Sequence, residues 1–289
     1  MDITPPRPKK KCRLPKPTPL PLIPLKNGGF YRFQGIFNGF SVCIKNIDEM
    51  KKCVSMGFFG KANLSRSYPQ FDGNIEKPEL IRKRQWHTRE RWHKKCNVNN
   101  SKKVIVLPDS DDEDGEYFKH LQAEYKIDRC GNLETVNLML EEAFFLQNVL
   151  NCLDIFHETR LLNNLETLQL FSNSDDCFQH KYVTYYHFRS KNWVVKPGIK
   201  FGGDFLLYKE GPPFHHASYV VLIQEENKEI DTTSLMGLHR MCETAGKELL
   251  ICQIFWPSEV TLLGDLSNIK VNEILMKRWV SSQERQEVI

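Results

Sequence analysis

The feature that constrains the fold most is a pair of apolar runs in the C-terminal third, separated by a short Gly-Pro-Pro loop. "DFLLY" (204–208) and "ASYVVLI" (217–223) have the length and composition of β-strands, and the loop between them contains His215 and His216. Apolar runs this close in the sequence are expected to pair as neighbours in one sheet. Tyr208 and the two histidines should then lie near one end of that sheet.

The segments around this pair alternate between helix and strand. The spacing of apolar residues predicts helices over 181–192 and 233–247, and it predicts further strands over 248–255 and 271–280. Helices interspersed with strands in this order are typical of an α/β domain. We therefore expect a compact α/β catalytic domain with a mixed sheet at 175–289.

The N-terminal half predicts a smaller mixed α/β domain at 29–157. Residues 30–44 have strand character, and 46–57 have the capping residues of a helix. Residues 132–156 predict a largely buried helix, because apolar positions occupy most of the helical circumference. The segment 158–174 is interpreted as a linker between the two domains.

Two segments fall outside these predicted cores. Residues 1–28 are rich in proline and lysine and are expected to form a disordered basic tail. Within it, "PPRPKKKCR" (5–13) is a basic cluster of the nuclear-import kind, which predicts a nuclear protein. An acidic, serine-bearing block makes residues 99–118 a predicted disordered insertion in the N-terminal domain.

Charge is distributed unevenly along the chain. Residues 1–100 contain 21 Lys and Arg against 7 Asp and Glu, whereas the remaining residues contain 19 against 29. A basic N-terminal third indicates a polyanionic partner, because Lys and Arg release counterions when they neutralise phosphates. "RKRQWHTRERWHKK" (82–95) is interpreted either as a phosphate-binding face or as a solvated helix anchored by Trp86 and Trp92.

Composition argues against several other classes of protein. No apolar run approaches the roughly 20 residues that cross a bilayer, and the N-terminus has no apolar signal core. We therefore expect neither secretion nor membrane contact. The nine cysteines are odd in number and include no CxxC pair, which favours reduced thiols over a zinc site or a disulfide framework.

The residues at the Gly-Pro-Pro loop form a set that can catalyse one kind of reaction. Consecutive His215 and His216 point to opposite faces in extended backbone, so only one of them can join Tyr208. Lys247, at the end of the helix predicted over 233–247, can bring an ammonium to the same area. A phenol, an imidazole and an ammonium can cleave RNA by acid–base catalysis and charge stabilisation on a phosphorane. The alternative is that these are structural residues.

A second alternative is a nuclease that depends on a metal ion. Asp204, Glu226 and Lys228 formally supply a D…(D/E)xK set, with carboxylates for magnesium and a lysine for the phosphate. That motif needs its ExK within a strand, whereas "QEENKEI" has the composition of a polar turn. Tolerance of a chelator distinguishes the two mechanisms.

Four segments resemble the tRNA intron endonuclease family. "KPGIKFGGDFLLYKEGPPFHHASYVVLI" is similar to the catalytic core of that family, and "LMLEEAFFLQNVLNCL" is similar to the helix that precedes it. "FYRFQGIFNGFSVCIKNIDEMKKCVSMGFFGKANLSRS" and "KRWVSSQER" are similar to the eukaryotic catalytic subunit assigned to the 5′ splice site. The resemblance covers most of residues 29–285, although "KFGGDF" is equally similar to the sister subunit that cuts the 3′ splice site.

The resemblance implies a role for each residue at the loop. It implies that Tyr208 is the general base, that His216 is the general acid and that Lys247 stabilises the transition state. It further implies metal-independent cleavage of pre-tRNA at the 5′ exon–intron junction, with no cofactor, leaving 2′,3′-cyclic phosphate and 5′-hydroxyl ends. His215 is then a packing or surface residue. The alternatives are the 3′-site subunit and a non-catalytic RNA-binding scaffold subunit.

The resemblance also implies partners. These are intron-containing pre-tRNA and three other subunits, one catalytic and two structural, in a nuclear heterotetramer, and an RNA kinase is a further candidate. The family's cation–π pair falls on Arg240 and Trp279, which would clamp a flipped-out base near the cut made by the other catalytic subunit. Arg240 lies seven residues before Lys247, so both could project from one helix face. The alternative is a surface arginine and a core tryptophan.

Overall fold

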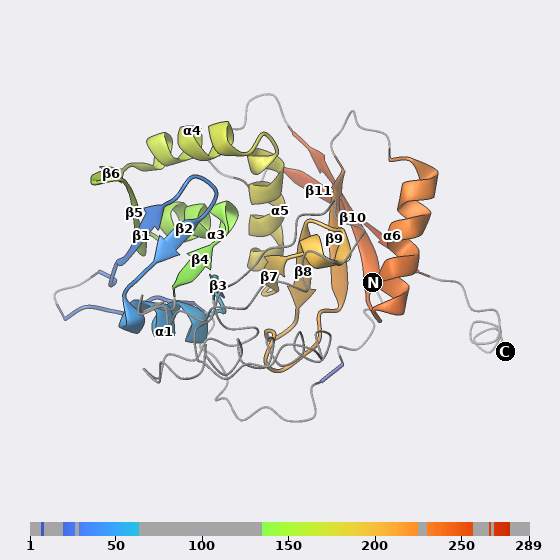
Figure 1. Cartoon of the computed structure of the whole chain (residues 1–289), viewed down its shortest axis with the longest axis horizontal. Coiled ribbons are helices and arrows are strands. Elements are labelled where there is room, and N and C mark those ends of the chain that lie inside the picture. Colours follow the sequence, from blue (N-terminus) through green and yellow to red (C-terminus); the bar gives the residue numbers. More distant parts are fainter. Residues whose placement is uncertain are drawn as a thin grey trace, which may run out of the picture. The chain divides into compact units, whose positions relative to one another are not determined.

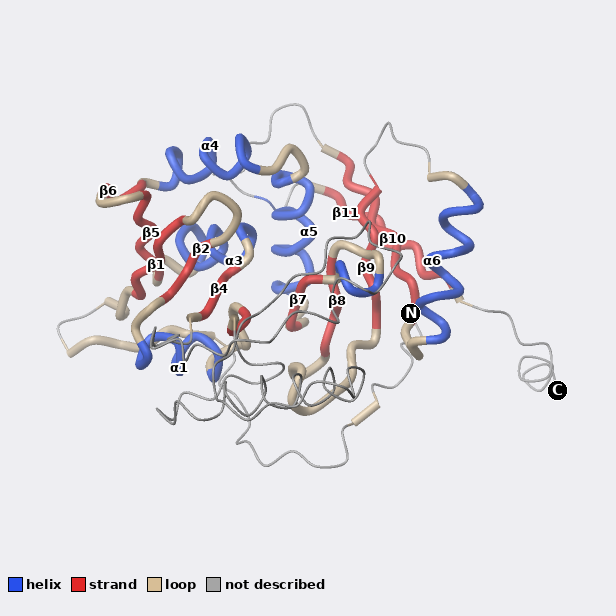
Figure 2. Tube along the Cα trace, viewed as in Figure 1, coloured by secondary structure: helices blue, strands red, loops and turns tan. Residues whose placement is uncertain are grey.

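The computed structural model describes residues 7–8, 20–26, 29–63, 135–224, 230–256, 266 and 269–277. These residues belong to one compact unit of the chain, made up of 1–70 and 134–289. The described helices and strands form two mixed sheets with helices beside them, so the predicted mixed α/β class is confirmed (Figures 1 and 2). The predicted insertion at 99–118 and the basic segment at 82–95 lie outside the described residues.

The first sheet has the strand order β3-β4-β2-β1-β5-β6. Its strands are β1 (Phe33–Phe37), β2 (Val42–Ile44), β3 (Lys61–Ala62), β4 (Val136–Leu138), β5 (Leu153–His157) and β6 (Arg160–Leu162). The pair β1–β5 is parallel and the other pairs are antiparallel. Segments from both ends of the predicted 29–157 region therefore meet in one sheet.

Helix α1 (Ile47–Ser55) follows β2, as the sequence predicts. The Asn46 side chain accepts a hydrogen bond from the Asp48 backbone N–H at 3.0 Å, which caps the first turn. The buried face of the helix carries Met50 and Cys53. Beyond its end the chain turns at Gly57, whose φ of 90° favours glycine.

The single helix predicted over 132–156 is wrong. The helical part is α3 (Leu140–Phe144) with a following π-helical turn (Phe145–Val149), and it is flanked by β4 and β5. Asn151, with a φ of 49°, turns the chain out of the helix and into β5. Strands and helix here are buried on several sides, so continuous apolar character does not distinguish them.

Residues 158–174, which we interpreted as a linker, contain β6 and helix α4 (Asn164–Ser174). A reciprocal capping box begins the helix: the Asn163 side chain accepts from Glu166 N–H, and the Glu166 carboxylate accepts from Asn163 N–H. Phe171 is fully buried. A capped start and a buried aromatic residue are features of a packed helix.

The second sheet has the order β11-β10-β9-β8-β7. Its strands and the helices in this half are β7 (Val194–Pro197), β8 (Phe205–Tyr208), β9 (Tyr219–Gln224), β10 (Glu248–Phe255), β11 (Lys270–Met276), α5 (Phe178–Ser190) and α6 (Thr232–Thr244). The pair β9–β10 is parallel and the others are antiparallel. The two apolar runs are paired neighbours, as expected.

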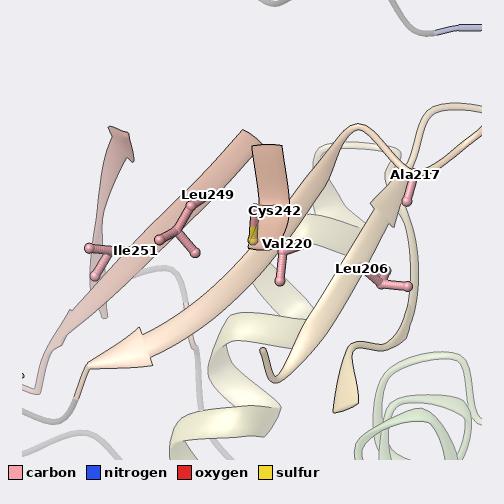
Figure 3. Packing of buried hydrophobic residues seen from close by; sticks show 6 residues of the cluster. All are labelled: Leu206, Ala217, Val220, Cys242, Leu249 and Ile251. Carbon is pink, nitrogen blue, oxygen red and sulfur yellow. The ribbon is translucent and has the colours of Figure 1, made fainter. Parts of the chain in front are cut away.

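One face of this sheet packs against α6. Leu206, Val220 and Leu249 lie side by side on three adjacent strands and pack in one cluster with Cys242 of α6 (Figure 3). Fully burying a side chain of this size stabilises the fold by about 1.5–3 kcal/mol. Side chains alternate along a strand, so Tyr208 shares the face of Leu206. No described helix is both long and apolar enough to cross a membrane.

An ion-pair cluster connects strand β11 to α5. The Glu273 carboxylate accepts hydrogen bonds from His187 Nε2 at 2.6 Å and from Lys191 Nζ at 2.5 Å. These contacts, led by the one from His187, lower the pKa of Glu273 to about 2. Because this pKa lies below its usual value, the cluster stabilises the fold fully above about pH 5 and loses that contribution as the pH falls towards 2.

We expect Glu273→Gln to lower the free energy of unfolding by about 2 kcal/mol at pH 7. The difference from the wild type should shrink as the pH falls from about 5 towards 2, because Glu273 takes up a proton in the unfolded chain while the folded chain still holds it as a carboxylate. Urea unfolding at several pH values measures this. Asp176→Asn, at an exposed position, removes the same charge and should have little effect. A deficit that does not change with pH would contradict the assignment.

Candidate active site

Strand register places Tyr208 and Lys247 on either side of Ser218. Leu207 pairs with Tyr219 on β9, and Tyr219 pairs with Glu248 on β10. The Ser218 N–H donates to Leu207 O at 2.9 Å, and Ser218 O accepts from Glu248 N–H at 3.0 Å. Residues opposite each other on neighbouring strands share a face. Tyr208 and Lys247 therefore lie on one face at the same end of the sheet, two strands apart.

The two histidines of the loop have different surroundings. The Gly211 carbonyl accepts from the N–H groups of both Phe214 and His215, so a tight turn ends directly before His216. The His215 side chain is only 16% exposed, with Nδ1 3.6 Å from Glu210 Oε2. His216, by contrast, is exposed.

Burial shifts the titration of both groups beside Ser218. Burial raises the pKa of the Tyr208 phenol. Burial also lowers the pKa of Lys247, and the positive charge of Arg7 adds to that effect. The Lys247 ammonium donates to Ala245 O at 3.2 Å and lies 4.5 Å from the centroid of the Phe201 ring. The site therefore holds an ammonium beside an aromatic ring and a phenol in a partly dry environment.

The N-terminal segment also reaches this loop. The His216 N–H donates to Arg7 O at 3.1 Å, and Pro8 forms an isolated β-bridge with His215. A Cβ at Gly246 would lie 3.0 Å from an Arg7 guanidinium nitrogen, so Arg7 sits close to the turn before Lys247. We expected residues 1–28 to be a disordered tail, and the basic cluster that contains Arg7 gave no indication of this contact.

Lys247 does not belong to α6, which corrects one argument from the sequence. The helix ends at Thr244, and Gly246 has a φ of 65°, so the chain reverses before Lys247. The inference that Arg240 and Lys247 project from one helix face is therefore wrong. Arg240 is exposed on α6, and Trp279 lies outside the described residues.

Ser218 is a site residue that the sequence analysis missed. It lies between Tyr208 and Lys247, and its Oγ is buried with no hydrogen-bond partner among the described residues. A buried hydroxyl usually has a partner, so Ser218 Oγ lacks a contact that most buried hydroxyls make. Its position on the same face as Tyr208 follows from the pairing register, which the sequence alone does not give.

The residues of the metal-dependent alternative lie elsewhere. Asp204 precedes β8, at the opposite end of the strand from Tyr208, and its carboxylate accepts from Ile223 N–H at 2.8 Å. It lines a cavity of about 550 Å³ together with Lys181 and Asp231. Glu226 and Lys228 lie outside the described residues. Within the described ranges, no three His, Cys, Asp or Glu side chains are grouped so that they could hold a metal ion.

The sequence around this site is similar to that of known proteins. Residues 178–261 match the family described as tRNA intron endonuclease, catalytic C-terminal domain. Over this segment the chain is similar to the catalytic domain of the tRNA intron endonuclease family. Tyr208, His216 and Lys247 all fall within the matched residues, so the site at the end of the sheet lies inside this domain. The resemblance inferred from the sequence is confirmed.

Individual relatives agree with the tRNA intron endonuclease assignment. The chain is 42% identical over 167 residues to the tRNA-splicing endonuclease subunit Sen2 of Gallus gallus, and 40% identical over 167 residues to that of Mus musculus. Each match covers 53% of this chain and 36% of the relative, so the chain matches about a third of their length. A probable subunit sen2 of Schizosaccharomyces pombe is 27% identical over 83% of this chain and 78% of its own.

Proposed function

We propose that this chain is the catalytic subunit of a tRNA-splicing endonuclease that cuts pre-tRNA at the 5′ exon–intron junction. The observation that carries the proposal is the meeting of Tyr208, the His216 loop and Lys247 at one end of the sheet, inside the family's catalytic domain. The names of the relatives support the substrate and the subunit character. A phenol, an imidazole and an ammonium together can cleave a ribose phosphate without a metal.

In the proposed reaction, the 2′-hydroxyl oxygen of the last exon nucleotide attacks the adjacent phosphorus. Tyr208 receives the proton of that hydroxyl, and the new 2′-O–P bond closes a cyclic phosphate. The P–O5′ bond breaks, and His216 gives a proton to the leaving 5′ oxygen. The ammonium of Lys247 stabilises the negative charge on the non-bridging oxygens of the phosphorane. The products are a 2′,3′-cyclic phosphate and a 5′-hydroxyl.

The raised pKa of Tyr208 determines how it can act as a base. With a pKa above the ordinary value of about 10, fewer than about one phenol in 1,000 is ionised at pH 7. In the proposal, the phenol therefore loses its proton before the 2′-hydroxyl transfers its own, and the ammonium of Lys247, on the same face of the sheet, offsets the charge of the phenolate. Because the reaction needs the phenolate of Tyr208 and the protonated imidazole of His216 together, these two requirements oppose each other as the pH rises.

The word subunit in the relatives' names supports an assembly of several chains. We propose a nuclear heterotetramer with one further catalytic subunit and two structural ones, with an RNA kinase as an associated partner. Arg240 and Trp279 are proposed to clamp a base near the cut that the other catalytic subunit makes, since base–aromatic stacking contributes about 1–3 kcal/mol. Exposure of Arg240 on α6 leaves its guanidinium accessible to RNA.

We expect cleavage by the complex purified through a tag on this chain to survive excess EDTA, provided that spermidine keeps the RNA folded. No step of the mechanism uses a metal ion, so chelation removes no reacting group. The 5′ exon should end in a cyclic phosphate, which analysis of the exon ends measures. A pre-tRNA with one 2′-deoxyribose at the last exon nucleotide should remain uncut at that junction, because it lacks the nucleophile.

Three other outcomes of these experiments would contradict the proposed function. Loss of cleavage that magnesium restores, or a 3′-hydroxyl product, favours the metal-dependent alternative at Asp204 and Glu226. Cleavage that Tyr208→Phe affects only at the 3′ junction identifies the sister subunit. Unchanged cleavage at both junctions with Tyr208, His216 and Lys247 all replaced identifies a non-catalytic scaffold.

A further inference from the structure

We propose that Phe58 is a positioning residue that fixes the loop carrying His216. Phe58 belongs to the turn Gly57–Gly60, which leads from α1 to β3, far in the sequence from the loop it contacts. The proposal rests on the proposed function, because it concerns the placement of that reaction's general acid. The N-terminal half of the chain then takes part in the reaction by holding the general acid in place.

The turn holds Phe58 in a conformation that phenylalanine rarely adopts. The φ of Phe58 is 58°, and Gly57 and Gly60 on either side have φ of 90° and 73°. A non-glycine residue with a left-handed backbone persists only where the surrounding structure enforces it. Phe58 is only 5% exposed. The unusual backbone conformation therefore goes together with a buried ring.

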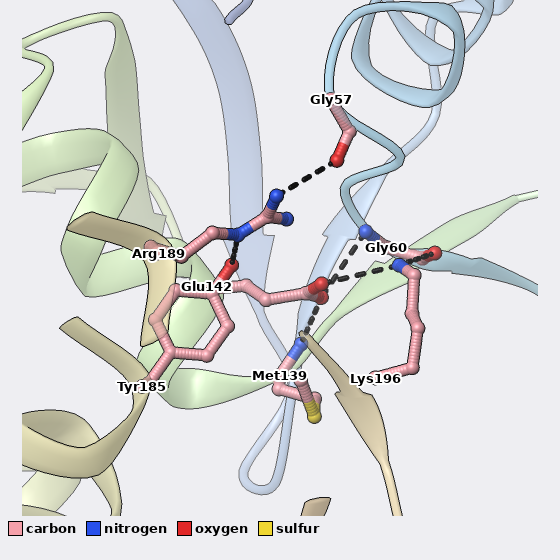
Figure 4. Close-up of polar contacts among 7 residues, drawn as sticks. All are labelled: Gly57, Gly60, Met139, Glu142, Tyr185, Arg189 and Lys196. Atoms are coloured by element: carbon pink, nitrogen blue, oxygen red, sulfur yellow. Dashed lines mark hydrogen bonds and ion pairs between the residues drawn. The ribbon is translucent and has the colours of Figure 1, made fainter. Parts of the chain in front are cut away.

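Buried charged groups fix both ends of the turn (Figure 4). Arg189 donates to Gly57 O at 3.0 Å, and Lys196 Nζ donates to Gly60 O at 2.7 Å. The Glu142 carboxylate accepts from Gly60 N–H at 3.1 Å. These groups come from α5, β7 and α3, which are separate elements of the fold. The turn is therefore anchored independently of the loop that it contacts.

The Phe58 ring lies directly against Gly211, in the turn before His216. A Cβ at Gly211 would lie 2.3 and 2.4 Å from two carbons of the Phe58 ring, so only glycine fits there. The ring also meets Phe214 edge-on, with centroids 6.0 Å apart and planes at 70°. Because Gly211 O accepts from the N–H groups of Phe214 and His215, the ring supports the whole turn.

This support reaches His216 through the backbone. His216 follows directly on the turn closed by Gly211 O, so a shift of that turn carries the imidazole with it. Without the Phe58 ring, the turn can settle towards the vacated space and move the imidazole away from the leaving oxygen. A displacement of about 1 Å at a reacting group can cost about 100-fold in rate.

We expect Phe58→Ala to lower kcat for the 5′ cut by about 10- to 100-fold while KM for pre-tRNA changes less than about 2-fold. The assay uses the purified complex and measures each junction separately. Phe171→Ala is the matched control, because this ring is also buried but belongs to α4, where it packs on Phe37 and Phe178 away from the turn. It should lower the melting temperature and leave kcat per folded complex within about 3-fold. Phe58→Met should restore most of the rate.

A double substitution separates positioning from stability. In the His216→Ala background, Phe58→Ala should cost less than about 2-fold more, because the group it positions is already absent. An equal loss with and without His216, or a normal kcat for Phe58→Ala, overturns the inference. If Phe58→Ala does not assemble, Phe58→Met and Phe58→Leu in the same cycle decide. A wild-type complex that cuts no intron-bearing pre-tRNA refutes the proposed function instead.

Discussion

Replacing His216 with alanine is expected to slow cleavage at the 5′ exon–intron junction by about 10²–10⁴-fold. The imidazole is proposed to give the proton to the leaving 5′ oxygen, and removing a general acid has effects of this size. Single-turnover cleavage of an intron-bearing pre-tRNA by the assembled complex measures the change. The 3′ junction in the same tube serves as an internal reference, because we assign it to another subunit.

His215→Ala is the matched control, since it removes the same ring from the adjacent position. His215 is mostly buried against Glu210, so its loss should change the 5′ rate by less than about 3-fold. Tyr208→Phe should be nearly as damaging as His216→Ala, because it removes only the hydroxyl that receives the proton. A larger loss for His215→Ala than for His216→Ala would contradict our assignment of the general acid.

Replacing Lys196 with methionine is expected to destabilise the chain by about 3–5 kcal/mol, because it leaves a buried carboxylate without its cation. The Lys196 ammonium lies 3.2 Å from Glu142 Oε1, and the Glu142 side chain is 1% exposed. This loss is a large part of the roughly 5–15 kcal/mol that stabilises a typical domain. Urea unfolding of the purified chain measures it.

Two further variants test the cause of that loss. Lys181→Met breaks a more exposed pair with Asp175 and should cost less than about 1 kcal/mol. Adding Glu142→Gln to Lys196→Met removes the unpaired charge and leaves an amide oxygen for the N–H of Gly60 or Met139. The double variant should recover part of the stability. If it is as unstable as Lys196→Met, the loss comes from packing and not from the unpaired charge.

The sequence predicts the elements whose signals are local. Paired apolar runs around a Gly-Pro-Pro loop identify β8 and β9, and the Asn46 cap identifies the start of α1. The same locality explains the errors. Apolar residues on all sides made 132–156 look like one helix, although its ends pair as strands with β1, β2 and β3. That pairing depends on partners about a hundred residues away in the sequence.

The same distinction between local and long-range signals applies to the candidate site. Tyr208, His216 and Lys247 were found from a motif, because their residue types carry the chemistry. Phe58 and Ser218 contribute through contacts that only the folded chain creates, so no local pattern indicates them. The contact of Arg7 with the loop was missed for a further reason: a segment rich in proline and lysine has the composition of a solvated tail.

The parallel pairing of β9 with β10 affects when a newly made chain can become active. Tyr208 and His216 leave the ribosome before Lys247, and parallel neighbours can pair only after the connecting segment through α6 has crossed over the sheet. Long-range pairing of this kind is a slow step in folding. The residues proposed to act together are therefore brought together only after the segment through α6 has folded.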